Sequence, residues 1–302
     1  MVRATRYPRR QSNPMLQPGP ELPFRWLDTL WVQVTGTLCN IACRHCFITC
    51  GPKAHDVPLM TLERVQSTLE QGRQLGMRHI YYTGGEPFLH PEIRQLTDLA
   101  LRIAPLTIVT NGLLLDEPTV AWVVDTFQKG RYSFDLRVSL DGTSREENDP
   151  VRGKGTFDEI VAAIQRLARA GLSPVVTVVE HQEGLAAADA RTRFIEFLYQ
   201  LGIQRPRLKF LPLLRIGREE RRTHGYLEEP ALSEQPLEAE IASTLLCATG
   251  RAVTAQGVYT CPILIKDVSA RLGDAVTEAA RPIRLGWNAC QTCVLEGLRC
   301  NT

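Results

Sequence analysis

The sequence has no long apolar run, little net charge and no secretory signal. No apolar stretch reaches the roughly 18 residues that a membrane-spanning helix needs. The formal net charge of the 302 residues is +2, so no global field attracts nucleic acid or an anionic membrane. The N-terminus is basic but lacks the apolar segment that a secretory signal requires. We therefore predict a cytoplasmic protein without nucleic-acid or membrane partners.

Cysteine is absent from the whole middle of the chain, between Cys50 and Cys247. The nine cysteines fall into two groups, four at residues 39–50 and five at residues 247–300. Disulfide frameworks belong to exported proteins and usually spread their bridges along the chain. Clustered thiols in a chain without an export signal therefore indicate metal sites.

The stretch between the two cysteine groups predicts alternating strands and helices. Six strand–helix units are too few for a closed eight-unit barrel, so we expect an α/β fold with a partial (β/α)6 barrel. The predicted strands are 31–35, 79–82, 107–110, 134–140, 175–179 and 207–214, and the predicted helices are roughly 60–75, 91–103, 116–127, 156–171 and 187–201.

Four regions are predicted along the chain. Residues 1–30 form a basic, Pro-rich arm, residues 31–215 the partial barrel, residues 216–240 a charged linker, and residues 241–302 a small Cys-rich module. Two interpretations stay open for Arg215 and Arg218 at the start of the linker. They either hold an anionic substrate or lie on a solvated surface.

Cys39, Cys43 and Cys46 lie in one short loop after the first predicted strand. Thiolate ligands suit iron–sulfur clusters, and the thiols of one loop can share a single cluster. Three thiolates leave one iron of a four-iron cluster without a protein ligand, which keeps that iron open to another molecule. The alternative for this loop is a zinc knuckle.

Two further motifs follow predicted strands. Residues 82–87 read Tyr-Thr-Gly-Gly-Glu-Pro, and residues 139–142 read Ser-Leu-Asp-Gly. With the cysteine triplet they resemble, in order and type, the motifs of the radical S-adenosylmethionine (radical SAM) enzymes. The resemblance implies a 4Fe–4S cluster on the triplet, S-adenosylmethionine on its open iron, and a flavodoxin- or ferredoxin-type reductant. Reductive cleavage would then give a 5′-deoxyadenosyl radical.

The resemblance gives residues 84–86 a role in binding S-adenosylmethionine. Gly84 and Gly85 would let the backbone approach the cofactor without a Cβ in the way. Glu86 would pair with the methionine ammonium. For the two glycines alone, a tight turn is the competing interpretation.

Four other residues are expected beside the cofactor. Ser139 and Asp141 would bond the ribose hydroxyls, although an Asp-Gly turn also explains them. His45 stands where the family usually has an aromatic residue, and its ring would stack on the adenine. Arg152 either reaches the carboxylate of the cofactor or is exposed to solvent.

The second cysteine group resembles the C-terminal auxiliary-cluster modules of radical SAM enzymes, which are called SPASM and twitch domains. The full SPASM form uses more cysteines than the five present here, so the shorter twitch form with one 4Fe–4S cluster fits better. We expect Cys247, Cys261, Cys290 and Cys293 to bind this cluster. A zinc ribbon on the same four residues is the alternative.

Cys50 and Cys300 remain outside both predicted ligand sets. A spare thiol is most often an inert small side chain. Some radical SAM epimerases, however, use a cysteine thiol to return a hydrogen atom to the substrate radical. Cys300 or Cys50 is therefore a candidate hydrogen donor, or else a substitute ligand.

The expected substrate is a carbohydrate-type natural product of antibiotic biosynthesis. The twitch-type relatives include enzymes that act on such sugars, and only 38 residues precede Cys39, fewer than a leader-binding domain needs. We place epimerisation slightly ahead of dehydrogenation. The alternatives are a maturase of ribosomally made peptides and a non-enzymatic, zinc-stabilised binding protein.

Overall fold

A computed structural model describes residues 19–181, 188–226 and 232–300 of the chain. Residues 1–18 of the predicted arm and 227–231 of the predicted linker lie outside these ranges, as does residue 187 at the predicted start of a helix. None of the helices described is both long enough and apolar enough to cross a membrane.

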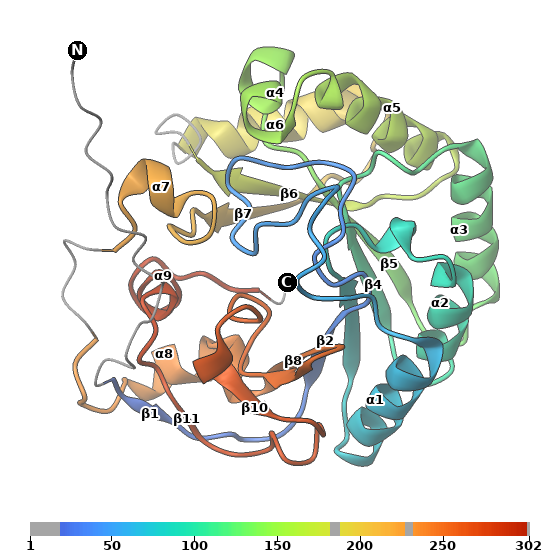
Figure 1. Ribbon diagram of the computed structural model, residues 1–302. Helices are drawn as coiled ribbons and strands as arrows, with labels where there is room; N and C mark the ends of the chain where they lie inside the picture. The colour runs from blue at the N-terminus through green and yellow to red at the C-terminus, as the bar shows by residue number, and fades with distance from the viewer. Residues whose placement is uncertain (1–18, 182–187, 227–231, 301–302) are drawn as a thin grey trace, which may run out of the picture.

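Six parallel strands curve around a lumen with helices on the outside, as the sequence predicted (Figure 1). Neighbouring strands pair in chain order from β2 to β7. The strands are β2 (Thr29–Gln33), β3 (His79–Thr83), β4 (Leu106–Thr110), β5 (Phe134–Ser139), β6 (Val175–Glu180) and β7 (Arg207–Pro212). The helices are α1 (Leu62–Gln74), α2 (Ile93–Leu101), α3 (Glu117–Lys129), α4 (Arg145–Arg152), α5 (Thr156–Arg169) and α6 (Ala188–Gln200).

The two faces of each strand have different neighbours because side chains alternate along a strand. In β5, Leu136 and Val138 are buried in the main hydrophobic core. Arg137 and Ser139 therefore lie on the opposite face, toward the lumen. A side chain caps the start of α3, where Asp116 accepts a bond from the backbone N–H of Thr119.

The C-terminal region adds to the same sheet. Strand β8 (Gly250–Thr254) pairs in parallel with β2, and β9 (Gly257–Tyr259) and β10 (Arg271–Gly273) extend it antiparallel. The described start of the chain is also paired, because β1 (Glu21–Leu22) forms a two-stranded sheet with β11 (Ile283–Arg284). Short helices α7 (Glu220–Thr223), α8 (Ala239–Thr244) and α9 (Ala289–Leu295) complete the described chain.

Helix α4 is absent from the sequence prediction. Its residues are mostly charged and include Pro150, so the segment shows no apolar periodicity. The helix is held instead by polar bonds: the Asn148 side chain accepts from the backbone N–H of Asp141 and donates to Thr156. The predicted α/β class with a parallel sheet is otherwise confirmed.

Arg251 of β8 ties the C-terminal region together. Its side chain is 1% exposed and donates to four backbone carbonyls, those of residues 247, 250, 279 and 281, at 2.7–2.8 Å. The guanidinium also lies over the ring of Phe24, 4.3 Å from its centroid.

We predict that Arg251→Met lowers the free energy of unfolding by about 3 kcal/mol or more, because it leaves buried carbonyls without donors. Urea unfolding of the apoprotein measures this change. Arg73→Met is the control, since Arg73 is exposed and its ion-pair partner among the described residues is Glu70, so the free energy of unfolding should change far less in this variant. Equal losses in the two variants would contradict the role of Arg251.

Candidate cofactor and cluster site

The loop after β2 brings Cys39, Cys43 and Cys46 together at the C-terminal end of the parallel strands. All three are free thiols, and Cys39 is buried. Burial raises the pKa of Cys39 to about 12, and the nearby charges of Glu86, Cys43 and Cys46 add to this effect. A metal that neutralises the thiolates would remove the penalty, so the donor set suits a cluster.

The two glycines let one part of the protein approach another. A Cβ at Gly85 would lie 1.9 Å from the carbonyl oxygen of Leu38 and 2.8 Å from the Cβ of Cys39. A Cβ at Gly84, where φ is +144°, would lie 2.2 Å from Thr35 Oγ1. The glycines therefore allow the cysteine loop to pack on the end of β3, and their direct approach to the cofactor stays a prediction.

Glu86 is fully buried and nearly saturated with hydrogen bonds. Its Oε1 accepts from Thr110 Oγ1 at 2.8 Å and from the N–H of Phe88 at 3.2 Å, and its Oε2 accepts from the N–H of Asn111 at 2.8 Å. Burial raises the pKa of Glu86 to about 7 despite these donors. One acceptor position remains on Oε2, which an ammonium group could use.

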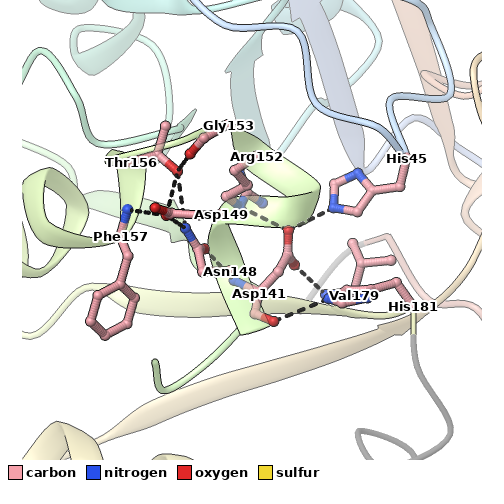
Figure 2. A network of polar contacts seen from close by, with 10 residues as sticks. All are labelled: His45, Asp141, Asn148, Asp149, Arg152, Gly153, Thr156, Phe157, Val179 and His181. Atoms are coloured by element: carbon pink, nitrogen blue, oxygen red, sulfur yellow. Dashed lines mark hydrogen bonds and ion pairs between the residues drawn. The ribbon is translucent and has the colours of Figure 1, made fainter. Parts of the chain in front are cut away.

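Asp141 forms one network with two other predicted residues, His45 and Arg152 (Figure 2). Its Oδ2 lies 2.6 Å from His45 Nε2 and 2.8 Å from Arg152 Nε, and its Oδ1 accepts from the N–H of Val179 at 2.9 Å. Burial alone would raise the pKa of Asp141, but the charges of Arg152 and His45 hold it well below its usual range.

This network gives Asp141 a role within the protein itself. Its carboxylate orients His45 and Arg152, and its bond to the ribose stays a prediction. Arg152 is 5% exposed, which excludes the solvent-exposed alternative. Ser139 is the last residue of β5 and lies on the lumen face of this strand, two residues before Asp141. Sequence reasoning missed His181, whose Nε2 lies 3.2 Å from the Asp141 carbonyl oxygen.

Cys50 lies against the first cysteine group. Its backbone N–H donates to Cys46 Sγ at 3.2 Å, and its own Sγ lies 3.8 Å from the carbonyl oxygen of Gly84. The thiol of Cys50 hydrogen-bonds to Cys46, which lowers the pKa of Cys46 to about 6. Cys50 is thus a neighbour of a predicted ligand.

The side chain of Arg218 holds the cysteine loop through hydrogen bonds to backbone carbonyls. Its Nη1 donates to the carbonyl oxygen of Cys43 at 3.1 Å, and its Nη2 donates to the carbonyls of Thr49 and Cys50. Its backbone N–H donates to the Cys46 carbonyl at 3.2 Å. Both earlier interpretations of Arg218, a substrate ligand and a solvated side chain, therefore give way to a structural one.

Arg215 has a different environment. Its Nη2 donates to Glu296 Oε1 at 3.1 Å, and its guanidinium lies 4.4 Å from the ring centroid of Tyr226. These contacts join the start of the predicted linker to α9. They place Arg215 apart from the cysteine loop that Arg218 holds.

All five C-terminal cysteines line one hollow with a cavity volume of about 30 Å³. Apart from these thiols and Thr260, its lining is apolar. Burial raises the pKa of Cys247 and of Cys290 to about 12, so their thiolates need a compensating metal. The donor set therefore suits an auxiliary cluster on the four predicted ligands, Cys247, Cys261, Cys290 and Cys293.

Cys300 is the fifth thiol of this hollow and also reaches the barrel. Its carbonyl oxygen accepts from Arg137 Nη1 of β5 at 3.0 Å. The charges of Lys209 and Arg137 act on its thiol, although burial still raises the pKa of Cys300 to about 11. Cys300 thus lies where the hollow meets the lumen.

Among the described residues, no three His, Cys, Asp or Glu side chains converge as the ligands of a single metal ion would. A four-iron cluster does not need such convergence, because its cysteines bind different irons.

Comparisons with known proteins agree with this geometry. The family model described as "Radical SAM superfamily" matches residues 34–180. Mycofactocin maturase MftC of Mycobacterium tuberculosis is 31% identical over 153 residues, which cover 50% of this chain and 37% of MftC. The probable GTP 3′,8-cyclase of Sulfurisphaera tokodaii is 26% identical over 226 residues, which cover 72% of this chain and 68% of the cyclase.

The fold is shared with SuiB of Streptococcus suis. Its crystal structure bound to S-adenosylmethionine aligns with a TM-score of 0.60 at 15% identity, over 80% of this chain and 62% of SuiB. Its structure bound to the precursor peptide SuiA also gives 0.60, at 14% identity, over 82% of this chain and 62% of SuiB. The chain thus spans less than two thirds of both MftC and SuiB.

We predict that Arg218→Gln lowers the iron and sulfide bound to the first cysteine group, because the loop loses three carbonyl anchors. Iron and sulfide per chain after anaerobic reconstitution measure this loss. Arg215→Gln is the matched control, since Arg215 bonds Glu296 and not the loop. Equal cluster contents in the two variants would refute the anchoring role.

We also predict that the ionisation of Glu86 lowers the free energy of unfolding of the apoprotein as pH rises. Its folded pKa of about 7 exceeds its unfolded value, so the folded state holds a proton that the unfolded state releases. This contribution is complete below about pH 4.5 and is lost as pH rises to about 7. Glu86→Gln should therefore flatten the fall in unfolding free energy between about pH 5 and about pH 7.5. The same slope in both proteins would show that Glu86 is already ionised.

Proposed function

The chain belongs to the radical SAM superfamily through its residues 34–180, and on that premise we propose that it is a radical SAM enzyme that modifies a peptide. The observation that carries the proposal is the meeting of three groups at one end of the barrel. These are the thiols of Cys39, Cys43 and Cys46, the buried carboxylate of Glu86, and the network around Asp141.

Each group has a task in binding the cofactors. The three thiols would hold a 4Fe–4S cluster, and the free position on Glu86 would accept the ammonium of S-adenosylmethionine. Asp141 fixes the positions of His45 and Arg152 beside them. When bound, the cluster and S-adenosylmethionine supply a 5′-deoxyadenosyl radical for hydrogen abstraction.

The support for a peptide substrate comes from the relatives. MftC is a maturase by name, and SuiB has been solved with a precursor peptide. They favour a peptide over the carbohydrate that the sequence suggested. A nucleotide is the second candidate, because the GTP 3′,8-cyclase match covers more of this chain than the MftC match does.

The C-terminal cysteines support an auxiliary cluster in the same enzyme. Cys300 remains our candidate hydrogen donor, since it lies between the hollow and the lumen. Cys50 is the weaker candidate, since its thiol is engaged with Cys46. Epimerisation and dehydrogenation stay predictions that product analysis distinguishes.

We predict that Cys43→Ala abolishes the reductive cleavage of S-adenosylmethionine, because two thiols in the loop cannot hold the cluster with an open iron. The measurement is 5′-deoxyadenosine formed under dithionite by anaerobically reconstituted protein. Ser67→Ala on the exposed side of α1 is the control and should keep the wild-type rate. Undiminished product in Cys43→Ala would refute the proposed site.

The substrate class is tested with a pool of synthetic peptides and, separately, with GTP, both in deuterium oxide. Mass changes in a peptide support the proposal, whereas a modified nucleotide would replace it with the second candidate. Solvent deuterium in an otherwise unchanged peptide indicates epimerisation, and a loss of two mass units indicates dehydrogenation.

A further inference from the structure

Arg137 is a buried cation with an unused edge. It lies in the middle of β5 on the lumen face, and its side chain is 3% exposed. Nη1 donates to the Cys300 carbonyl, whereas Nε and Nη2 are buried without any hydrogen-bond partner among the described residues. A buried guanidinium with unpaired donors is costly, so its retention calls for a ligand.

The two unpaired nitrogens form one side of the guanidinium. The N–H bonds of Nε and Nη2 run nearly parallel, and this geometry matches the two oxygens of a carboxylate. The nearby acid Asp135 does not fill the position, because its Oδ2 pairs with Arg207 at 2.6 Å. The free edge is therefore shaped for a planar anion that the described chain does not provide.

The guanidinium is held rigidly in its place. Its Cζ lies 5.2 Å from the ring centroid of Tyr81, and Tyr81 stacks on Trp31 with centroids 4.2 Å apart and planes 5° from parallel. The stack fixes one face of Arg137, and the Cys300 carbonyl fixes one end. A site that is oriented before its ligand arrives loses little entropy on binding.

Other polar atoms on the same inner faces also lack partners. Trp31 Nε1, Gln33 Oε1 and Thr177 Oγ1 are buried and have no hydrogen-bond partner in the described part of the chain. Trp31 and Gln33 alternate with the core residues of β2, and Thr177 lies between Val176 and Val178 of the core in β6. The lumen thus offers donors and acceptors to a polar ligand such as a peptide.

The position of Arg137 suits a substrate. It precedes Asp141 by four residues, so its Cα lies about 13 Å below the cofactor end of the barrel at 3.3 Å per residue. It also contacts Cys300, at the border of the auxiliary hollow. A molecule bound there would lie between the two cysteine groups.

We propose that Arg137 binds a carboxylate of the substrate through its Nε and Nη2 edge, and so selects acidic peptides. The proposal rests on the peptide substrate proposed above. A phosphate would fit the same fork, and we favour a carboxylate because peptides carry one and the proposed substrate is a peptide.

The test uses three tripeptide probes and the reconstituted wild-type protein with S-adenosylmethionine. The probes are acetyl-Ala-Glu-Ala-amide, acetyl-Ala-Gln-Ala-amide, and acetyl-Ala-Gln-Ala with a free terminal carboxylate. Anaerobic calorimetry should show that at least one acidic probe binds about tenfold or more tighter than the neutral one. Whichever of the two acidic probes has the lower Kd indicates whether a side chain or a C-terminus supplies the carboxylate.

Three variants assign the preference to Arg137. Arg137→Gln should remove it, and Arg137→Lys, which keeps the charge but loses the paired donors, should retain only part of it. Arg73→Gln removes an exposed arginine and should leave the preference intact. Iron and sulfide content verifies that each variant has assembled its clusters. If Arg137→Gln fails to assemble them, Arg137→Lys tests the proposal by itself.

Several outcomes would overturn the proposal. The wild-type protein could bind all three probes equally, Arg137→Gln could keep the preference, or inorganic phosphate could displace an acidic probe better than acetate does.

The wild-type assay of 5′-deoxyadenosine separates this proposal from the proposed function. A protein that prefers acidic probes but cleaves no S-adenosylmethionine refutes the function and leaves the site standing. A protein that cleaves the cofactor and ignores the acidic group refutes the site alone.

Discussion

The loop from Cys39 to Cys50 lies outside every helix and strand, and distant segments hold it in position. The Leu38 carbonyl before it accepts from the N–H of Glu86 at 3.0 Å, and the Arg44 N–H donates to the Val151 carbonyl at 2.7 Å. Arg218 binds it from beyond β7, and Lys266 donates to Thr49 at 2.6 Å. The placement of three thiols therefore depends on the barrel, on α4 and on the C-terminal region together.

The strands and the motif positions follow from local rules, which explains why the sequence predicts them. β-Branched runs and apolar periodicity depend on burial of one face, and all six predicted strands appear within about two residues of their expected bounds. Parallel α/β folds place loops that bind ligands at the C-terminal strand ends, so the cysteine loop, Glu86 and Asp141 meet there. Helix α4 was not predicted because it is stabilised by the hydrogen bonds of Asn148 and has no apolar periodicity.

The hydrogen bonds and ion pairs that orient the site could not be predicted from the sequence for a different reason. His45 and Asp141 are 96 positions apart, and Arg218 is 175 positions from Cys43. A charged residue in a polar segment has many possible partners, and only the closed fold selects one. For Arg218 the sequence therefore offered a substrate ligand or a solvated surface, and it did not predict the bonds of Asp141 to His45 and Arg152. The glycines at 84 and 85 were recognised as close-contact positions, and the structure adds a close contact with the segment that carries the cysteine loop.

The two cysteine groups are joined through the lumen by one continuous set of contacts. Cys300 borders the auxiliary hollow, its carbonyl holds Arg137, and Arg137 lies on the stacked rings of Tyr81 and Trp31. Trp31 belongs to β2, whose end leads into the cysteine loop. A displacement of the C-terminal region would therefore move the guanidinium of Arg137, and with it the group that we propose binds the substrate. Because interiors are close-packed, such a shift would not be absorbed locally, so in the proposed binding mode the C-terminal region would help to define where the substrate lies.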